Sequence, residues 1–276
     1  MPPQHDAATL TTALGAWELT VNTAIAEANG VETVTREQWL AARRALLARE
    51  KELTYLQDEI ARERRALPRL RVDKDYRFDT LEGPRTLGEL FEGRSQLLVQ
   101  HFMFAPGWEQ GCKSCSFMAD HNDGANLHLA QRDVTLLAVS RAPLAEIERF
   151  RQRMGWKFKW ASSHGTTFNH DFGVNFSQDE MSSGKVLYNY VRQPFPHEEA
   201  PGISVFQRDE AGDVFHTYSR YGRGVEVMMH TYNLLELTPK GRDEDALDYP
   251  MAWVRHHDRY DTSPVATPGG CCATKP

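Results

Sequence analysis

The chain has 276 residues, 41% of them hydrophobic and 25% charged, a composition typical of a folded globular protein with a sizeable core. A formal net charge of -6 argues against a nucleic-acid surface as its main function. The sequence shows neither a signal-peptide pattern nor an apolar run long enough to span a membrane. We therefore expect a cytoplasmic protein with no nucleic-acid or membrane partner.

The first 70 residues are predicted to form a helical N-terminal extension. Its main element is an amphipathic helix over Thr35–Pro68, because apolar residues from Trp39 to Ile60 recur at helical spacing between arginines and glutamates. Thr35 and Gln38 form a weak capping box at its start, and Pro68 marks its end. Such a helix packs on its own domain or on a second subunit, and a homodimer through this helix is one expectation.

Residues 71–245 alternate between strand and helix patterns. The predicted elements are a strand at 76–78, a turn from 81, a short helix at 86–91, a buried strand at 95–104, a helix at 116–131, a strand at 133–140, a helix at 143–155, a strand at 156–162, a hairpin over 202–221 and a helix at 226–237. An irregular insertion is expected at 164–200, and a partly flexible tail at 246–276. This order predicts an α/β fold with a thioredoxin-like mixed sheet flanked by helices.

The four cysteines occur as two pairs, Cys112 with Cys115 and Cys271 with Cys272. In a reducing compartment, clustered cysteines more often indicate redox chemistry or metal binding than structural disulfides. Cys112 is predicted to lie between a buried strand and the start of a helix, where the helix dipole and free backbone N–H groups favour the thiolate. Cys115, one turn further, would resolve a mixed disulfide formed by Cys112.

Two other interpretations of this pair stay open. The cysteines would be unreactive thiols at a helix start, or they would bind a metal with two further ligands from His121, His128, Cys271 or Cys272. The sequence has no second CxxC and no HxxxH motif at zinc-finger spacing, so no metal or other cofactor is expected.

Four further residues are candidates for substrate binding or support. Lys113 adds a cation beside Cys112, and Trp108 would shield the thiolate or contact the substrate. Arg141 follows the second buried strand, at the edge of the sheet where ligands gather in open α/β folds. Pro201 is the candidate for a cis-proline opposite the cysteines, with Ser204 as the alternative in that register.

The chain resembles a bacterial domain-of-unknown-function family, numbered 899, whose members are described as predicted dithiol–disulfide oxidoreductases. The resemblance covers roughly residues 35–244, with long matching stretches that include EQWLAARRALLAREKELT, SQLLVQHFMFAPGWEQGCKSCSFMADHNDG, RDVTLLAVSRAPL, FNHDFGVNF and RQPFPHEEAPGISVFQRD. It implies a thioredoxin-like domain with a helical N-terminal extension, and Cys112 and Cys115 as the redox pair. The implied partners are a protein or small-molecule disulfide and a cellular thiol that acts as reductant.

The sequence departs from true thioredoxins at the motif itself. Gly111 precedes the first cysteine where thioredoxins have tryptophan, and Lys113–Ser114 replaces Gly–Pro. A peroxide-reducing variant would need threonine where Glu109 stands. The leading prediction is a thiol–disulfide oxidoreductase. The alternatives are a non-catalytic binding module, which holds either a partner or a metal through Cys and His, and a redox sensor.

Overall fold

The computed structural model describes residues 31–260. The chain separates into two compact units, Met1–Arg65 and Ala66–Pro276, which are described in turn. In the first unit, helix α2 runs over Arg36–Arg65 and confirms the predicted amphipathic helix. The Thr35 hydroxyl accepts from the Gln38 amide N–H at 3.3 Å, and the Gln38 side chain accepts from the Thr35 N–H at 2.9 Å, which completes the capping box.

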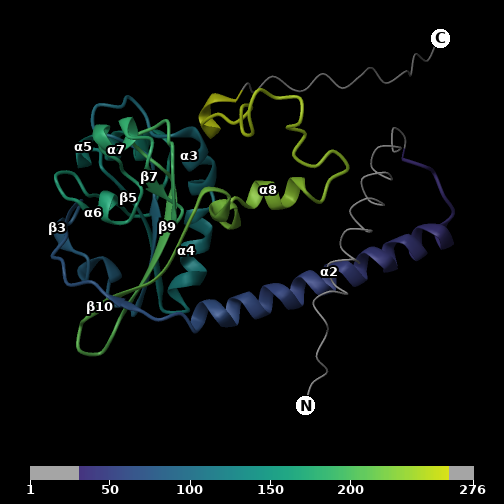
Figure 1. Cartoon of the computed structure of the whole chain (residues 1–276), viewed down its shortest axis with the longest axis horizontal. Coiled ribbons are helices and arrows are strands. Elements are labelled where there is room, and N and C mark those ends of the chain that lie inside the picture. The colour runs from purple at the N-terminus through teal and green to yellow at the C-terminus, as the bar shows by residue number, and fades with distance from the viewer. Residues whose placement is uncertain (1–30, 261–276) are drawn as a thin grey trace, which may run out of the picture. The chain divides into compact units, whose positions relative to one another are not determined.

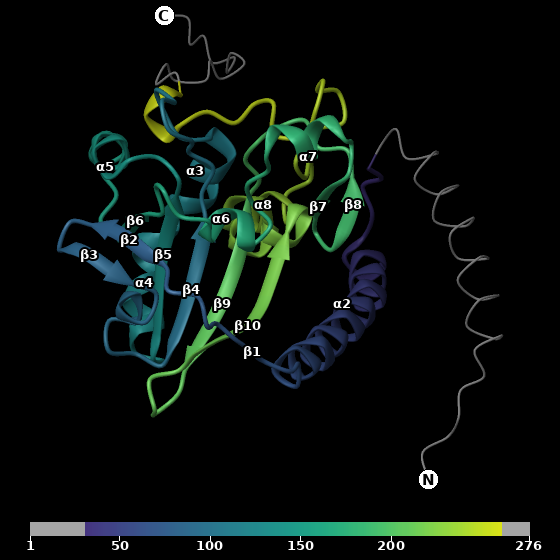
Figure 2. The same cartoon turned by 60° about the vertical axis from the view of Figure 1, so that its left-hand side comes forward.

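The second unit is built on one eight-stranded sheet in the order β1-β10-β9-β4-β5-β6-β2-β3. Its strands are β1 (Leu70–Arg71), β2 (Arg77–Thr80), β3 (Gly83–Thr86), β4 (Gln96–His101), β5 (Val134–Ser140), β6 (Trp160–Ser162), β9 (Gly202–Arg208) and β10 (Val214–Tyr221). Strands β4, β5 and β6 are parallel, whereas β9 pairs antiparallel with both β4 and β10. Figure 2 shows the long strands β4, β9 and β10 of this mixed sheet side by side.

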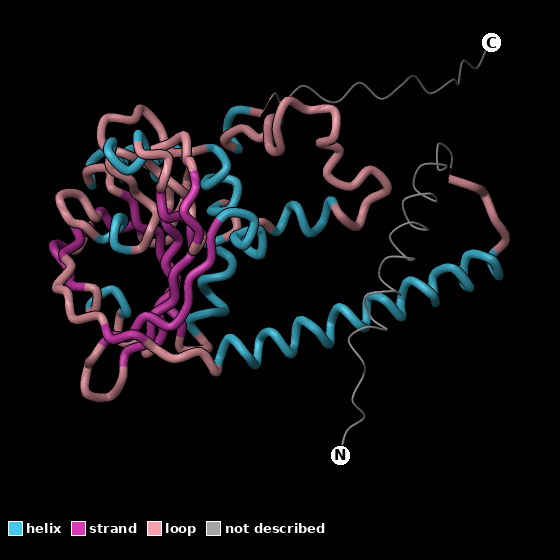
Figure 3. Tube along the Cα trace, viewed as in Figure 1, coloured by secondary structure: helices cyan, strands magenta, loops and turns pink. Residues whose placement is uncertain are grey.

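Helices connect and cover these strands, as Figures 1 and 3 show. They are α3 (Lys113–Ala119), α4 (Asn122–Ala130), α5 (Leu144–Arg153), α6 (Phe168–Asp171), α7 (Gln178–Ser182) and α8 (His230–Leu235), with 3₁₀ turns η1 (Glu89–Phe91), η2 (Gly222–Met228) and η3 (His257–Arg259). The β4–α3/α4–β5 crossover followed by the β9–β10 hairpin and α8 is the thioredoxin-like arrangement. The predicted fold class is confirmed.

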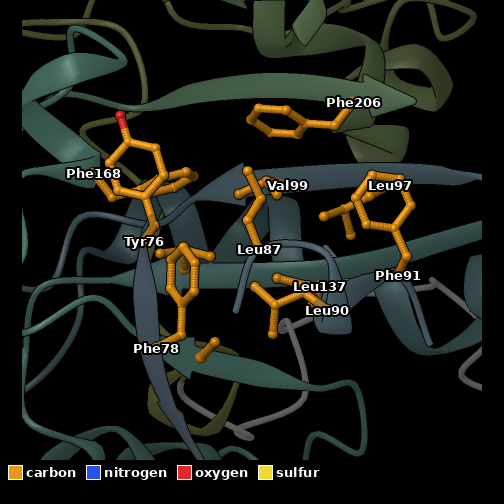
Figure 4. Packing of buried hydrophobic residues seen from close by; sticks show 12 residues of the cluster. Tyr76, Phe78, Leu87, Leu90, Phe91, Leu97, Val99, Leu137, Phe168 and Phe206 are labelled. Carbon is orange, nitrogen blue, oxygen red and sulfur yellow. The ribbon is translucent and has the colours of Figure 1, made fainter. Parts of the chain in front are cut away.

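Alternate residues of β4 divide the core between the two faces of the sheet. Leu97 and Val99 pack with η1, β2 and α6 in the cluster drawn in Figure 4. Leu98 faces the opposite way and packs in a cluster formed by α3, η2 and α8. The strand is therefore buried on both faces, which explains its continuous apolar sequence.

Some predicted elements differ in the structure. The single helix expected at 116–131 is two helices, because the chain breaks at Asp120 and His121. The strand expected at 156–162 is limited to Trp160–Ser162. The insertion at 164–200 contains α6, α7 and the hairpin of β7 (Val186–Tyr188) and β8 (Val191–Gln193). It buries a small core that includes Tyr221 of β10.

No helix within residues 31–260 combines the length and the apolar character that crossing a membrane requires.

Candidate active site

Cys112 and Cys115 lie where the loop after β4 enters α3. The Cys112 amide donates to the carbonyl of Met103 at 3.0 Å, which folds the loop back toward the end of β4. Cys112 is the N-cap residue of α3, with a non-helical ψ of 131°, and its carbonyl accepts the first helical hydrogen bond from Ser116 at 2.9 Å. Both cysteines are free thiols; Cys112 is half-buried and Cys115 is buried.

The two thiols have opposite acid–base character. The Cys115 side chain donates a hydrogen bond to the Cys112 sulfur, and this bond is the largest reason why the pKa of Cys112 falls to about 6, although burial opposes it. The backbone N–H groups of Ser114 and Cys115 and the Ser114 hydroxyl lower the pKa further. For Cys115, the same hydrogen bond, burial and the neighbouring Cys112 charge raise the pKa well above its usual range. One sulfur is thus prepared as a thiolate nucleophile and the other is kept as a thiol.

Buried amide side chains fix the backbone under Cys115. Gln100 on β4 donates to the Cys115 carbonyl at 3.1 Å, and Asn122 on α4 donates to the Gln100 side-chain oxygen at 2.7 Å. Both amides are almost completely inaccessible to solvent. These residues were not predicted from the sequence; the signal for them is the polar Gln100 inside an otherwise apolar strand.

Gly111, directly before Cys112, fills a space that admits no side chain. A Cβ atom there would lie 2.6 Å from Cε1 of Phe102 and 2.9 Å from Cε1 of Phe150. Both rings are buried in the cluster that also contains Cys115. The departure from the tryptophan of thioredoxins therefore has a packing reason in this chain.

Trp108 and Lys113, two of the other predicted site residues, contact different parts of the protein. Trp108, like Cys112, packs against the cluster that contains Phe102 and Phe150. The Lys113 ammonium lies 3.4 Å from the Tyr249 hydroxyl and 5.6 Å from the centre of its ring. Lys113 is thus engaged by a tyrosine.

Arg141 holds a buried carboxylate, Glu199, at 2.5 Å and also reaches Glu198 at 3.2 Å. Burial raises the pKa of Glu199 to about 7, against the opposing effect of Arg141. The charge of Glu199 in turn contributes to the raised pKa of Cys115. Arg141 is therefore connected to the cysteine pair through Glu199, a residue that the sequence did not single out.

Pro201 lines a pocket together with both cysteines. The expectation of a cis peptide bond at Pro201 is wrong, since every peptide bond in residues 31–260 is trans. Ser204 lies in β9, where its hydroxyl is 2.7 Å from Nε2 of the buried His101.

The pocket beside the cysteines has a volume of about 360 Å³. It is bordered by α3, by η2 and α8, and by residues 250–251. Its walls are mostly apolar, with methionines from four different segments. A volume in this range fits a small organic group.

The metal interpretation finds no support in the part of the chain that the structure describes, where no three His, Cys, Asp or Glu side chains gather. His121 instead bonds to the Thr231 hydroxyl at 3.1 Å. Cys271 and Cys272 lie outside the described residues.

A model of a family described as bacterial protein of unknown function (DUF899) matches residues 28–260, most of the chain. The chain belongs to this family. Among curated proteins, none matches.

Solved structures with some similarity are peroxiredoxins. Peroxidoxin BcpB from Mycobacterium tuberculosis is 13% identical with a TM-score of 0.41, and the match covers 60% of this chain and 97% of BcpB. A variant of peroxiredoxin Q from Xanthomonas campestris is 10% identical with a TM-score of 0.38, covering 57% of this chain and 90% of that one. PrxQ from Xylella fastidiosa is 11% identical, also at 0.38, covering 60% and 94%.

In this DUF899 member, residues 249–260 are here called the C-terminal strap. They contact the loop between β4 and α3, residues 102–112, here called the cysteine loop. His256 bonds through Nε2 to the carbonyl of Gly111 at 2.9 Å and through Nδ1 to the Arg153 guanidinium at 2.8 Å. A guanidinium only donates, so Nδ1 accepts and Nε2 carries the proton. Asp258 fixes Arg153 by two further bonds at 3.0 and 3.1 Å. The strap could not be identified from the sequence, because its contacts join segments more than a hundred residues apart.

Proposed function

We propose that this protein is a dithiol–disulfide oxidoreductase in which Cys112 is the nucleophile and Cys115 the resolving thiol. The observation that carries the proposal is the asymmetry of the pair: a half-buried sulfur of lowered pKa next to a buried sulfur of raised pKa. Thiol–disulfide exchange requires both, since the attacking group is a thiolate and the resolving group must stay protonated until the mixed disulfide has formed.

The reaction follows from these roles. The Cys112 thiolate attacks one sulfur of the substrate disulfide, the S–S bond breaks, and one substrate thiolate leaves and takes up a proton. Cys115 then loses its proton and attacks the Cys112 sulfur. The second substrate thiol leaves and a Cys112–Cys115 disulfide remains. Two electrons pass from the protein dithiol to the substrate, and two cellular thiol groups return them as they are oxidised to a disulfide.

The buried Cys115 needs its proton removed in the second step. Formation of the mixed disulfide removes the Cys112 negative charge, which is one cause of the raised pKa of Cys115. The pKa of Cys115 is therefore expected to fall once Cys112 has reacted. The chemistry of the first step thus prepares the second.

The partners in this proposal are a protein or small-molecule disulfide and a cellular thiol reductant, without a metal or organic cofactor. A cytoplasmic location agrees with a pair of thiols that is kept reduced between turnovers.

Single replacements of the two cysteines test the proposal. In a background with Cys271→Ser and Cys272→Ser, the reduced protein is mixed with a disulfide and its intact mass is recorded. The parent should lose two hydrogens as it forms the internal disulfide. Cys115→Ser should stop as a mixed disulfide that carries half of the substrate, and Cys112→Ser should not react.

Disulfide turnover by Cys112→Ser at the parent rate would contradict the proposal. The alternative, a non-catalytic metal-binding module, predicts zinc or copper bound to the purified protein and no mixed disulfide in Cys115→Ser. Elemental analysis of the same samples distinguishes the two.

A further inference from the structure

The pocket beside Cys112 and Cys115 combines reacting sulfurs with an apolar wall. Met103, Met118, Met229 and Met251 contribute to this wall from the cysteine loop, α3, the start of α8 and the C-terminal strap. Methionine is unbranched and polarizable, so such a wall adapts to apolar groups of different shape. The apolar wall lies beside the attacking sulfur, so it would contact the substrate group next to the attacked sulfur.

The basic side chains of the pocket are already engaged within the protein. Arg242 bonds to Glu236 at 2.5 Å and to Glu226 at 2.8 Å, and its guanidinium lies 4.0 Å from the centre of the Tyr232 ring. Arg223 pairs with the same Glu226 at 3.0 Å, and its side chain is 86% exposed. Both arginines thus already hold a carboxylate, and Arg223 extends mostly into solvent rather than into the pocket.

The acidic side chains are engaged as well. Glu226 is shared by the two arginines just described. One oxygen of Glu244 accepts from the Tyr232 hydroxyl at 2.7 Å, from Trp253 Nε1 at 2.6 Å and from the Met251 amide at 3.0 Å. Apart from the Cys112 thiolate that attacks the substrate, the charged side chains of the pocket are therefore engaged within the protein, and a charged substrate group that enters the pocket would lose its hydration without gaining an unpaired partner.

We propose that this pocket receives an uncharged, apolar substituent of a small disulfide and so sets the substrate class of the enzyme. The inference rests on the proposed function, since it is the Cys112 sulfur at the edge of the pocket that attacks. Disulfides with carboxylate or ammonium groups near the sulfurs, such as the disulfides of acidic or amino thiols, are poor substrates. Dialkyl or other uncharged disulfides are good ones.

The test compares disulfides that differ in charge at similar size. Reduced protein is mixed in single-turnover experiments with dipropyl disulfide, with dithiodipropionic acid or with cystamine, and the conversion of the protein to its internal disulfide is followed by intact mass. Each rate is divided by the rate of the same disulfide with a simple alkyl thiolate, which removes differences in leaving group. We expect dipropyl disulfide to exceed both charged compounds by at least about tenfold, the scale of discrimination that an apolar pocket supplies.

A charge placed in the pocket extends the test. Met251→Lys should bring the normalised rates of dipropyl disulfide and dithiodipropionic acid closer together, because the new ammonium gives the carboxylate a partner. Val191→Lys adds the same charge on the exposed strand β8, outside the pocket, and should leave the difference between the two rates unchanged.

The outcomes separate the two proposals. If the charged disulfides react as fast as dipropyl disulfide after normalisation, the substrate class is wrong while the dithiol chemistry stands. If none of the three oxidises the protein, the proposed function fails and the inference falls with it. The wild-type comparison decides the inference even if Met251→Lys does not fold.

Discussion

At the scale of single residues, the site depends on what surrounds two sulfur atoms. Cys112 and Cys115 could be identified from the sequence, because CxxC after a buried strand is a recognisable pattern. Their difference in pKa could not, since it arises from a hydrogen bond between the side chains and from the burial of Cys115. Gln100, Glu199 and His256 were missed because their contacts with the cysteine region are made only in the folded chain.

Gly111 gives a prediction at this scale. Gly111→Ala should lower the free energy of unfolding by about 1–3 kcal/mol, because the new methyl group would overlap two buried phenylalanine rings. Urea denaturation measures the change. Gly124→Ala is the matched control: nothing lies within 4 Å of its Cβ position in α4, so alanine there should stabilise by roughly 0.5–1 kcal/mol. Equal effects of the two substitutions would contradict the packing account.

At the scale of elements, the long strands and helices follow from periodicity, whereas their ends depend on distant partners. The strand predicted at 156–162 is short because the Asp123 carboxylate accepts from the amides of Lys157 and Phe158 at 2.6–3.2 Å. These amides are therefore not available to a neighbouring strand. The break between α3 and α4 occurs at Asp120, whose carboxylate accepts from Trp156 at 2.8 Å and from His257 at 2.6 Å. Local sequence propensity does not reveal hydrogen bonds between residues far apart in the chain.

The C-terminal strap gives the prediction at this scale. His256→Ala should increase amide hydrogen exchange in residues 109–113 and 255–260, since it leaves the Gly111 carbonyl without its side-chain donor. His256→Gln, which retains a donor, should recover part of the protection. His128→Ala, at an exposed position on α4, serves as the control. Unchanged exchange in His256→Ala would show that the strap does not hold the cysteine loop.

At the scale of the whole molecule, the fold class could be predicted because strand and helix patterns alternate in the thioredoxin-like order. The sequence did not reveal the strands that widen the sheet, β1 and β3. Strand β1 has two residues, and β3 contains a proline and begins at Gly83 with a φ of 99°. Strands this short lack a detectable period and form through their neighbours.

Helix α2 gives the prediction at this scale. Trp39, Leu46, Leu53 and Ile60 recur every seven residues and are 44–56% exposed, and α2 has no buried residue. A seven-residue apolar repeat is the pattern of helices that pair. We propose that α2 pairs with α2 of a second copy, so Leu46→Glu with Leu53→Glu should convert a dimer into a monomer in light-scattering measurements. Ala48→Glu with Tyr55→Glu, on the opposite side of the helix, should leave the dimer intact. A monomeric parent protein would refute the pairing.

The pH dependence of Cys112 alkylation tests the central claim most directly. In the Cys271→Ser, Cys272→Ser background, the rate of modification by iodoacetamide should rise with pH to a plateau with a midpoint near 6, because the thiolate is the reactive form and the pKa of Cys112 is about 6. Cys115→Ser should move this midpoint, because it replaces the thiol that donates to the Cys112 sulfur. A midpoint at about 8.5, the ordinary value for a free cysteine, in the parent protein would contradict the account.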